Sequence, residues 1–300
     1  MRSPTQPLVG VDDIAGIVRD GLGADVTGAS ELSGGGFAAV WRASLTDGRE
    51  VVVKVGPPAS ARLLSYECGL IPAEAEYFSL VRGKAPVPAV LAGSDNWIIS
   101  SLLPGRPLTD GDSPRAREQL GAAIARVHTV SGPLFGYTGG RPSGSDWPAA
   151  FHAMIESLRA DADAWAVPLP PLDGLIARHH AVLATVERPA LLHFDLWDGN
   201  VLVAPDGSLS GLVDGERYLY GDPLLDFVSP ALFQRIDESH PFVVGYGAGP
   251  FTAAERTRLA LYRVHLYVLM LAEGPSRGIA LDADRQKLVT ALLEAELAEL

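Results

Sequence analysis

The sequence predicts an α+β fold of two lobes, in which a small β-rich lobe over residues 1–100 precedes a larger helical lobe over residues 106–300. Three observations support this prediction. Strand-like runs alternate with turn residues from about 26 to 56, and apolar stripes at helical spacing dominate after residue 105. Strands and helices also fail to alternate in the way that builds a parallel sheet. Residues 101–105, which contain a Pro-Gly pair, form the predicted linker.

The first lobe is predicted from runs that favour strands and are joined by turn residues. They cover Val26–Ser33, Phe37–Leu45 and Glu50–Val55, with a glycine triplet after the first run and Thr46-Asp47-Gly48 after the second. Short turns between β-branched runs indicate an antiparallel meander. A further buried strand is expected at Trp97–Ile99.

Helices are predicted where apolar residues recur three and four positions apart. One such stretch, Ser65–Val81, lies in the first lobe and ends before Pro86. The second lobe repeats the pattern, with a short β-like island at Leu191–Val213. Its predicted helices are Arg115–Val130, Trp147–Trp165, Leu172–Val186, Thr252–Ala272 and Asp282–Leu300.

Composition excludes several classes of protein. The 300 residues are 47% hydrophobic, which supports a sizeable core and excludes a disordered chain. The net charge of −12 argues against a nucleic-acid partner, which needs a basic surface, and favours a neutral or cationic small molecule. No apolar run is long enough to span a bilayer, so no membrane partner is expected. The single cysteine and the lack of an apolar N-terminal run predict a cytoplasmic location.

The strongest chemical signal is a motif that begins at His193. Asp195 follows two positions later, Asn200 five positions after that, and the apolar run Val201–Val203 comes directly afterwards. This spacing is typical of the catalytic loop of phosphotransferases. There, a carboxylate orients the acceptor hydroxyl, and an amide oxygen reaches the metal that bridges the nucleotide phosphates. The alternative interpretation is a surface turn of Asp, Gly and Asn that closes a hairpin.

A second carboxylate follows at the end of a predicted strand. Asp214 comes fourteen residues after Asn200 and directly after two apolar residues. Because Mg²⁺ prefers hard oxygen ligands, Asn200 and Asp214 are the predicted pair of protein ligands. Taken alone, Asp214 beside a glycine also fits an ordinary turn.

Lys54 lies inside the apolar run Val51–Val55. A buried ammonium must be paired or it loses its charge, and phosphate oxygens or a glutamate are natural partners. Glu74 and Glu76, on the helix that follows, are the two candidates, of which we favour Glu74. Alternatively, Lys54 faces solvent from an edge strand.

The glycine triplet lies one hairpin before this lysine. In the segment Ser33, Gly34, Gly35 and Gly36, small residues let backbone N–H groups approach phosphates closely. Many hairpins contain such a triplet, so alone it is a weak signal. Its position before Lys54 is the order that a nucleotide-covering loop needs.

In this order, the features resemble those of the aminoglycoside phosphotransferase-like family, which includes fructosamine, choline and antibiotic kinases. The resemblance extends from about Leu32 to Phe227 and is strongest in Leu192–Asn200. It implies a bilobal protein-kinase-like fold. It also implies transfer of the γ-phosphoryl group of ATP or GTP to a hydroxyl or amine of a small molecule.

The resemblance further implies a role for each matching residue. Asp195 would be the catalytic residue, acting chiefly by orienting the acceptor and capturing its proton late. Asn200 and Asp214 would hold Mg²⁺. Lys54, paired with Glu74, would orient the α- and β-phosphates.

Other matches imply binding and structural roles. Ser101 and Leu103, at the linker, would offer backbone groups to the purine. Asp222 and Asp226 would hold loop and helix ends in place. Two residues depart from the family pattern. Phe194 replaces a small residue, which we expect to narrow the floor of the pocket, and Gly215 replaces a bulky one.

The acceptor is the least determined part. An aminoglycoside-type antibiotic is the first expectation, because several carboxylates on the predicted C-terminal helices would suit a cationic acceptor; each could equally lie on a solvated helix face. One alternative is a metabolic kinase of the same fold that acts on an amino sugar, glycated amine or choline-like acceptor. Another is a nucleotide-binding regulatory module without turnover. The oligomeric state is not predicted. The carboxylates are Glu156, Asp161, Asp163, Asp237, Glu238 and Glu273.

Overall fold

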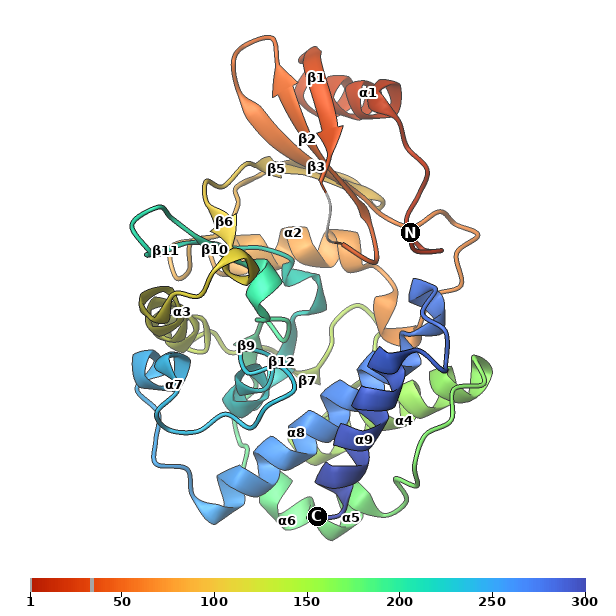
Figure 1. Cartoon of the computed structure of the whole chain (residues 1–300), viewed down its shortest axis with the longest axis vertical. Coiled ribbons are helices and arrows are strands. Elements are labelled where there is room, and N and C mark those ends of the chain that lie inside the picture. The colour runs from red at the N-terminus through yellow and green to blue at the C-terminus, as the bar shows by residue number, and fades with distance from the viewer. Residues whose placement is uncertain (1, 33–34) are drawn as a thin grey trace.

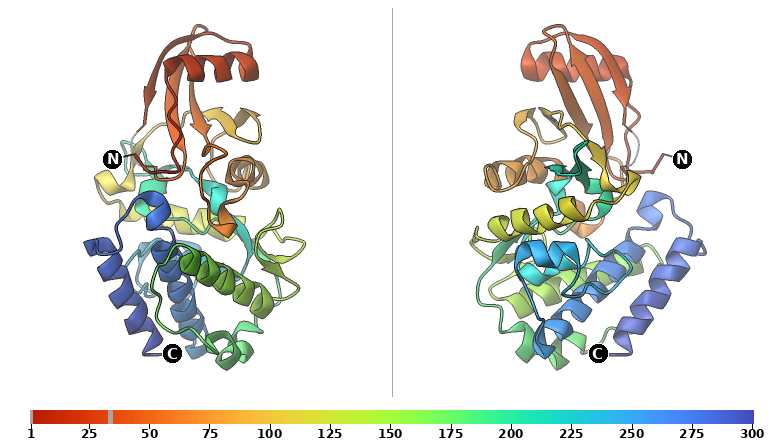
Figure 2. Two further views of the ribbon diagram at one scale, coloured as in Figure 1. Left: turned by 90° about the vertical axis from the view of Figure 1, so that its right-hand side faces the viewer. Right: turned by 60° about the vertical axis from the view of Figure 1, so that its left-hand side comes forward.

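The computed structural model describes residues 2–32 and 35–300. Figure 1 shows a β-rich lobe above a larger lobe that is mainly helical, and Figure 2 shows the same division from two further sides. The α+β, two-lobed fold predicted from the sequence is therefore confirmed. Within the described residues, no helix combines the length and apolar character that crossing a membrane requires.

The first lobe contains an antiparallel five-stranded sheet with the strand order β1-β2-β3-β5-β4. Lys54 lies on the central strand, where it pairs with Val40 on one side and Ile98 on the other. This position rules out an edge strand for Lys54. The strands are β1 (Val26–Glu31), β2 (Ala39–Leu45), β3 (Glu50–Val55), β4 (Val90–Gly93) and β5 (Trp97–Ser101).

A helix that the sequence analysis did not predict covers one face of this sheet. Helix α1 (Val11–Leu22) begins with Asp13 accepting a hydrogen bond from the backbone N–H of Gly10. It buries Ile14 and Val18 in a small core with the apolar side chains of β2 and β3. The amphipathic spacing of these two residues was a signal that the sequence contained.

The predicted helix Ser65–Val81 is interrupted. The structure has a 3-10 turn, η1 (Ser65–Glu67), followed by helix α2 (Leu70–Leu80). Gly69, between them, has a left-handed φ of 71°, which ends the turn and redirects the chain. Cys68, the only cysteine of the sequence, is exposed at this break.

The second lobe is built around helix α8, which is buried along most of its length. Its N-terminus carries a capping box between Thr252 and Glu255. The expected helix over 172–186 is split into two short helices at His179, whose φ of −107° is not helical. The helices are α3 (Pro114–Val127), α4 (Trp147–Ala164), α5 (Leu175–Arg178), α6 (His180–Leu183), α7 (Pro241–Tyr246), α8 (Ala253–Ala272) and α9 (Asp284–Leu297).

Glycines bring α3 and α7 into backbone contact. A Cβ added to Gly121 would lie 2.0 Å from the carbonyl oxygen of Phe242, and one added to Gly245 would lie 1.8 Å from that of Glu118. Both distances are far below any real Cβ contact, so the two helices can approach this closely only at glycine.

Two small sheets position the chemistry-bearing loops. The predicted island over 191–213 resolves into β9, which leads to His193, and the hairpin β10-β11, which separates Asn200 from Asp214. One sheet has the order β11-β10-β6 and the other β8-β7-β12-β9. Their strands are β6 (Arg106–Pro107), β7 (Phe135–Gly136), β8 (Ser143–Gly144), β9 (Ala190–Leu192), β10 (Val201–Val203), β11 (Leu209–Leu212) and β12 (Leu219–Gly221).

Candidate active site

A buried carboxylate holds the predicted catalytic loop. Asp226 accepts hydrogen bonds from the backbone N–H groups of His193, at 2.9 Å, and Phe194, at 2.6 Å. The Nε2 atom of His128 lies 3.0 Å from the same carboxylate. These bonds hold Phe194 at a φ of 65°, a conformation that non-glycine residues rarely adopt. Asp226 thus fixes the turn directly before Asp195.

Asp195 is partly exposed, with 19% of its side chain accessible. Its backbone N–H donates to Nδ1 of His193, and its carbonyl oxygen accepts from Nδ2 of Asn200 at 2.9 Å. Nε of Arg217 lies 3.7 Å from Oδ2 of Asp195. Burial raises the pKa of Asp195 to about 6, and the Arg217 charge opposes that rise. The group is therefore ionised at neutral pH and able to accept a proton.

A hydrogen bond joins Asn200 to the residue directly before Asp214, although the β10-β11 hairpin separates them in sequence. The N–H of Val213 donates to the carbonyl oxygen of Asn200 at 3.1 Å. The carbonyl oxygen of Val213 in turn lies 3.1 Å from Nε2 of His193. Because the Asn200 amide nitrogen is bonded to the catalytic loop, its Oδ1 atom remains for a cation.

The ammonium of Lys54 lies among three carboxylates. It is 2.9 Å from Glu74 and 2.6 Å from Glu216, and it also contacts Asp214. Only 8% of Lys54 is exposed, so it does not face solvent. Of the two glutamates considered on α2, Glu74 is the one beside the lysine, whereas Glu76 is exposed.

The charged groups of this cluster shift one another's pKa values. Burial alone would lower the pKa of Lys54, but the three carboxylates raise it well above its usual value. Burial raises the pKa of Glu74 to about 7 and also raises that of Glu216. Although burial acts in the same sense on Asp214, the lysine charge holds its pKa below the usual value. One cation facing three carboxylates leaves an excess of negative charge, which favours a further cation.

These residues have the chemistry of a magnesium site. Oxygens of Glu74, Asp214 and Glu216 all lie within 4.8 Å of one another, and hard carboxylate oxygens are the ligands that Mg²⁺ prefers. Glu216 was not predicted as a site residue. It lies in the 3-10 turn Gly215–Arg217 that directly follows Asp214, so only its closeness to Asp214 in sequence was a signal.

The predicted glycine-rich segment is only partly described. Ser33 and Gly34 lie outside the described residues. Gly35 and Gly36 follow, and among the described residues no hydrogen bond engages their N–H groups. Those groups are available to an anion such as a phosphate.

The start of the chain ties this segment to the second lobe. Thr5 Oγ1 donates to the carbonyl oxygen of Gly36 at 2.9 Å, and Gln6 Nε2 donates to that of Gly35 at 2.8 Å. Ser3 Oγ donates to the carbonyl oxygen of Ser276 at 3.3 Å. The sequence analysis contained no indication of this arrangement.

The two linker residues differ in what they can offer a purine. The N–H of Ser101 already donates to the carbonyl oxygen of Ala89, and the Oγ atom of Ser101 accepts a hydrogen bond from the N–H of Ala89. Within the described part of the chain, no hydrogen bond engages the backbone of Leu103. The Leu103 side chain covers Gly211 of β11, where a Cβ would lie 2.5 Å from it.

A buried network of charges lies beside Asp195, and sequence reasoning missed it. Arg217 bonds Glu273 at 2.8 Å, and Glu273 also contacts Tyr66 and Arg277. Arg277 in turn pairs with the buried Glu67 of η1. Burial would raise the pKa of Glu273, but the two arginines hold it below its usual value. The Arg217–Glu273 and Glu67–Arg277 pairs join residues 56 and 210 positions apart in sequence, so no local pattern reveals them.

The carboxylates considered for a cationic acceptor do not gather at Asp195. Glu273 is the one that lies in the network just described. Four of the others are engaged elsewhere: Glu156 with Arg159, Asp161 with the backbone and hydroxyl of Ser65, Asp237 with Ser239, and Glu238 with Arg256. The fifth, Asp163, is exposed on α4.

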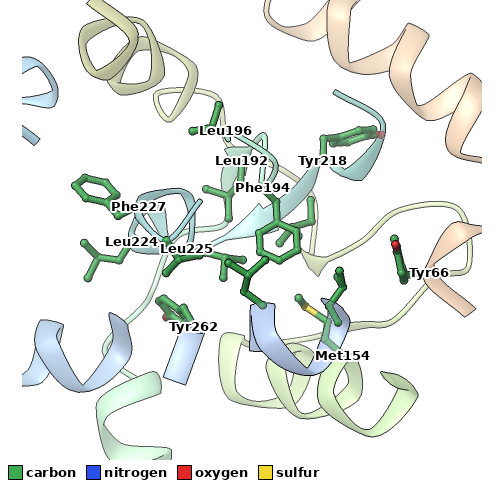
Figure 3. Close-up of a cluster of buried hydrophobic side chains, with 14 of the residues drawn as sticks. Tyr66, Met154, Leu192, Phe194, Leu196, Tyr218, Leu224, Leu225, Phe227 and Tyr262 are labelled. Carbon is green, nitrogen blue, oxygen red and sulfur yellow. The ribbon is translucent and has the colours of Figure 1, made fainter. Parts of the chain in front are cut away.

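Both departures from the family pattern have a structural reason. Figure 3 shows Phe194 among core side chains of the second lobe, and its ring packs 5.1 Å from that of His265. With 1% exposure, it does not form the floor of an open pocket. Gly215 faces Tyr77 of α2, where a Cβ would lie 2.1 Å from the ring, so a bulky residue has no room.

This fold and this arrangement define the class of protein-kinase-like phosphotransferases. The model of the phosphotransferase enzyme family matches residues 28–262, and the chain belongs to this family. The resemblance inferred from the sequence motifs is therefore confirmed.

Two curated relatives are probable ketoamine kinases. The relative from Thermus thermophilus is 28% identical over 272 residues, covering 87% of this chain and 92% of that protein. The relative from Lactiplantibacillus plantarum is 27% identical over 193 residues, covering 56% of this chain. The chain spans 64% of the length of the second protein.

Solved structures share the fold. One from Thermobifida fusca, assigned as a fructosamine-3-kinase, is 26% identical with a TM-score of 0.69; the match covers 96% of this chain and all of that one. The aminoglycoside phosphotransferase APH(4)-Ia, solved with AMP-PNP and hygromycin B, is 17% identical with a TM-score of 0.64. That match covers 95% of this chain and 98% of the other.

Proposed function

We propose that this protein transfers the γ-phosphoryl group of ATP or GTP to a hydroxyl group of a ketoamine, the rearranged adduct of a sugar and an amine. The observation that carries this proposal is the convergence of four predicted residues at the junction of the two lobes. Lys54 contacts Asp214, and Val213, directly before Asp214, donates a hydrogen bond to the backbone of Asn200. The side chain of Asn200 in turn bonds to the backbone of Asp195.

The proposed reaction breaks the bond between the γ-phosphorus and the oxygen it shares with the β-phosphate, and forms a bond from phosphorus to the acceptor oxygen. The acceptor proton passes to Asp195, whose pKa of about 6 leaves it ionised and ready at neutral pH. Positioning and charge neutralisation supply most of the rate enhancement in such a transfer.

Other residues of the chain hold the nucleotide in this proposal. Lys54 orients the α- and β-phosphates. The N–H groups of Gly35 and Gly36, which make no hydrogen bond within the described residues, contact phosphate oxygens. Asn200 and Asp214 would hold Mg²⁺, which would neutralise phosphate charge when bound, and Asp214 belongs to a group of three carboxylates whose oxygens lie within 4.8 Å of one another. The linker at residues 101–105 acts as the hinge.

A ketoamine acceptor is better supported than an aminoglycoside. Two relatives that match the chain are probable ketoamine kinases, and the Thermobifida fusca structure, 26% identical to this chain, is assigned to the same chemistry. Four of the six carboxylates expected to bind a polycation are engaged elsewhere, and Arg217 adds positive charge next to Asp195. The APH(4)-Ia likeness supports the fold only.

A coupled assay of nucleotide turnover over a panel of acceptors tests the proposal. The panel contains rearranged glucose and ribose adducts of amines, the parent sugars and amines, choline, and several aminoglycosides. We expect turnover with the adducts only, with a phosphorylated adduct detected by mass spectrometry. Transfer to aminoglycosides alone would contradict the ketoamine assignment. Firm nucleotide binding without transfer to any acceptor would instead support a regulatory module.

A further inference from the structure

Residues 3–6, near the start of the chain, form a strap whose polar side chains are packed into the structure. Thr5 is 1% exposed and Ser3 is 8% exposed. Their hydroxyl oxygens lie 2.9 Å apart, and the side chain of Gln6 accepts a hydrogen bond from the N–H of Ser3 at 3.0 Å. Because burying a polar side chain is costly unless it is hydrogen-bonded, the partners of this N-terminal strap indicate what it does.

The partners of the N-terminal strap are carbonyl oxygens of residues 35–38, the described end of the glycine-rich segment and its continuation, which we call loop 35–38. Thr5 Oγ1 donates to the carbonyl oxygen of Gly36 at 2.9 Å. Gln6 Nε2 donates to that of Gly35 at 2.8 Å and to that of Ala38 at 3.2 Å. Two side chains of the strap therefore hold three carbonyl groups of this short loop.

These hydrogen bonds fix the direction of the N–H groups in loop 35–38. Across a planar trans peptide, the N–H of the following residue points opposite to the carbonyl group. The cis peptide bond in the described part of the chain, Gly249-Pro250, lies outside this loop. The N–H groups of Gly36 and Phe37 consequently point away from the strap, and no hydrogen bond engages them within residues 2–32 and 35–300. Successive N–H groups of this kind can bind an anion.

Loop 35–38 lies next to the end of β3 that carries Lys54. Strand β2 begins directly after the loop at Ala39, which pairs with Val55 of β3. The next residue of β2, Val40, pairs with Lys54. The proposed function places the nucleotide phosphates at this end of the sheet.

The N-terminal strap also connects loop 35–38 to the second lobe. Ser3 Oγ donates to the carbonyl oxygen of Ser276, in the 3-10 turn η6 (Pro275–Arg277). Arg277 of the same turn has its Cζ atom 5.3 Å from the ring centre of Phe37. The charge network beside the catalytic carboxylate includes Arg277. One turn of the second lobe therefore contacts the strap, the loop and that network.

We propose that Thr5 and Gln6 are positioning residues that hold loop 35–38 so that its N–H groups bind a phosphate group of the nucleotide. The N–H groups are those of Gly36 and Phe37. This inference rests on the proposed function and adds two residues to its nucleotide site. Neither side chain touches the nucleotide in this proposal, because each acts through a carbonyl group of the loop. Without them the peptide groups of the loop can rotate, so the cost falls on phosphate binding and not on binding of the base or the ribose.

Thr5→Val tests the proposal, because valine has nearly the shape of threonine but no hydroxyl. Titration calorimetry in the presence of Mg²⁺ measures the Kd of ATP or GTP, whichever the enzyme uses, and that of the matching nucleoside, which has no phosphate. We expect Thr5→Val to raise the Kd of the triphosphate about 3- to 10-fold, the net contribution of one hydrogen bond, and to leave that of the nucleoside unchanged.

The two ligands separate a positioning role from a general structural one. An equal rise in both Kd values would indicate a structural role and overturn the proposal, as would an unchanged Kd of the triphosphate. Either result leaves the proposed function standing, because phosphoryl transfer by the unmodified protein is measured separately. Failure of the unmodified protein to bind the triphosphate would contradict the proposed function and this inference together.

Three further variants assign the effect to the strap. Gln6→Met removes the second donor at a partly buried position and should weaken triphosphate binding selectively, even if Thr5→Val melts at a lower temperature. Thr5→Ser keeps the hydroxyl and should keep the ratio of the two Kd values. Thr27→Val is the matched control, because the exposed Thr27 also donates to a carbonyl oxygen, that of Ser44 at 3.0 Å. A selective loss of triphosphate binding in Thr27→Val as large as in Thr5→Val would overturn the proposal.

Discussion

At the scale of single residues, Arg217 sets the protonation of its neighbour Asp195. Burial raises the pKa of Asp195 to about 6, and the Arg217 charge, 3.7 Å away, opposes the rise. A carboxylate that accepts a proton loses activity as pH falls through its pKa. Arg217→Gln should therefore move the acid limb of the kcat/KM profile to higher pH. We expect no such movement for Arg159→Gln, and an unchanged limb in Arg217→Gln would contradict the coupling.

Asp195 itself should affect turnover far more than binding. In the described structure, the side chain of Asp195 bonds neither Lys54 nor the three carboxylates that surround Lys54. Asp195→Ala should bind nucleotide almost normally but turn over at least ~10²-fold more slowly, the low end of what a positioned acid–base group contributes. Titration calorimetry and single-turnover kinetics measure the two effects. Asp214→Ala provides the contrast, because it should weaken binding of the magnesium nucleotide. Unchanged turnover in Asp195→Ala would reject its assignment.

The closeness of the candidate site residues could be predicted where they follow one another at short spacing. His193, Asp195 and Asn200 form one motif, and Asp214 lies two residues after β11, so a single hairpin brings them together. Glu216 was missed although it lies two residues further on. Arg217 and Glu273 could not be paired from the sequence, because their contact depends on how the end of α8 lies against the 3-10 turn η4 (Gly215–Arg217).

At the scale of elements, the contact of α3 with α7 depends on glycines, which have no side chain to hold the two helices apart. The Cβ of an alanine at Gly121 would lie 2.0 Å from a backbone oxygen of α7, so the helices would have to separate. Gly121→Ala should lower the free energy of unfolding by at least about 1–3 kcal/mol, as overpacking does. Chemical denaturation measures this change. Gly16→Ala is the control, because a Cβ there meets nothing within 4 Å and should stabilise α1 by about 0.5–1 kcal/mol. Equal effects of the two substitutions would refute this explanation.

The errors in the predicted elements have local causes. The helix expected over 65–81 was predicted to continue through Gly69, but the left-handed backbone of this residue separates η1 from α2. The helix expected over 172–186 was predicted to continue through His179, because histidine is not a residue type that indicates the end of a helix. Apolar spacing indicates that a stretch can be helical, but tertiary contacts decide where the helix ends.

At the scale of the whole molecule, one ion pair connects two residues that lie 210 positions apart in the chain. Glu67 is fully buried and pairs with Arg277, 210 positions later. Removing one partner of a buried pair leaves an uncompensated charge, so Arg277→Met should cost about 3–5 kcal/mol of unfolding free energy. The double variant Glu67→Gln/Arg277→Met should recover part of that loss. Equal stability of the single and double variants, measured by urea denaturation, would contradict the prediction.

The two-lobed architecture could be predicted because composition changes along the chain. Strand-like runs precede residue 101, and helical spacing follows it, which matches the sheet and the helices of the structure. The arrangement of helix α1, strand β4 and the segment from Ser3 to Gln6 could not be predicted, because it depends on contacts with distant residues. The residue pattern of a single sequence does not determine long-range packing.

The exposed Cys68 gives this chain a natural attachment point for a fluorescent dye. It is the only thiol in the sequence, so maleimide labelling needs no cysteine to be removed or introduced. Its neighbours on either side are Glu67, paired with Arg277, and helix α2, which carries Glu74 to Lys54. A dye at this position would report in real time any shift of α2 when nucleotide arrives.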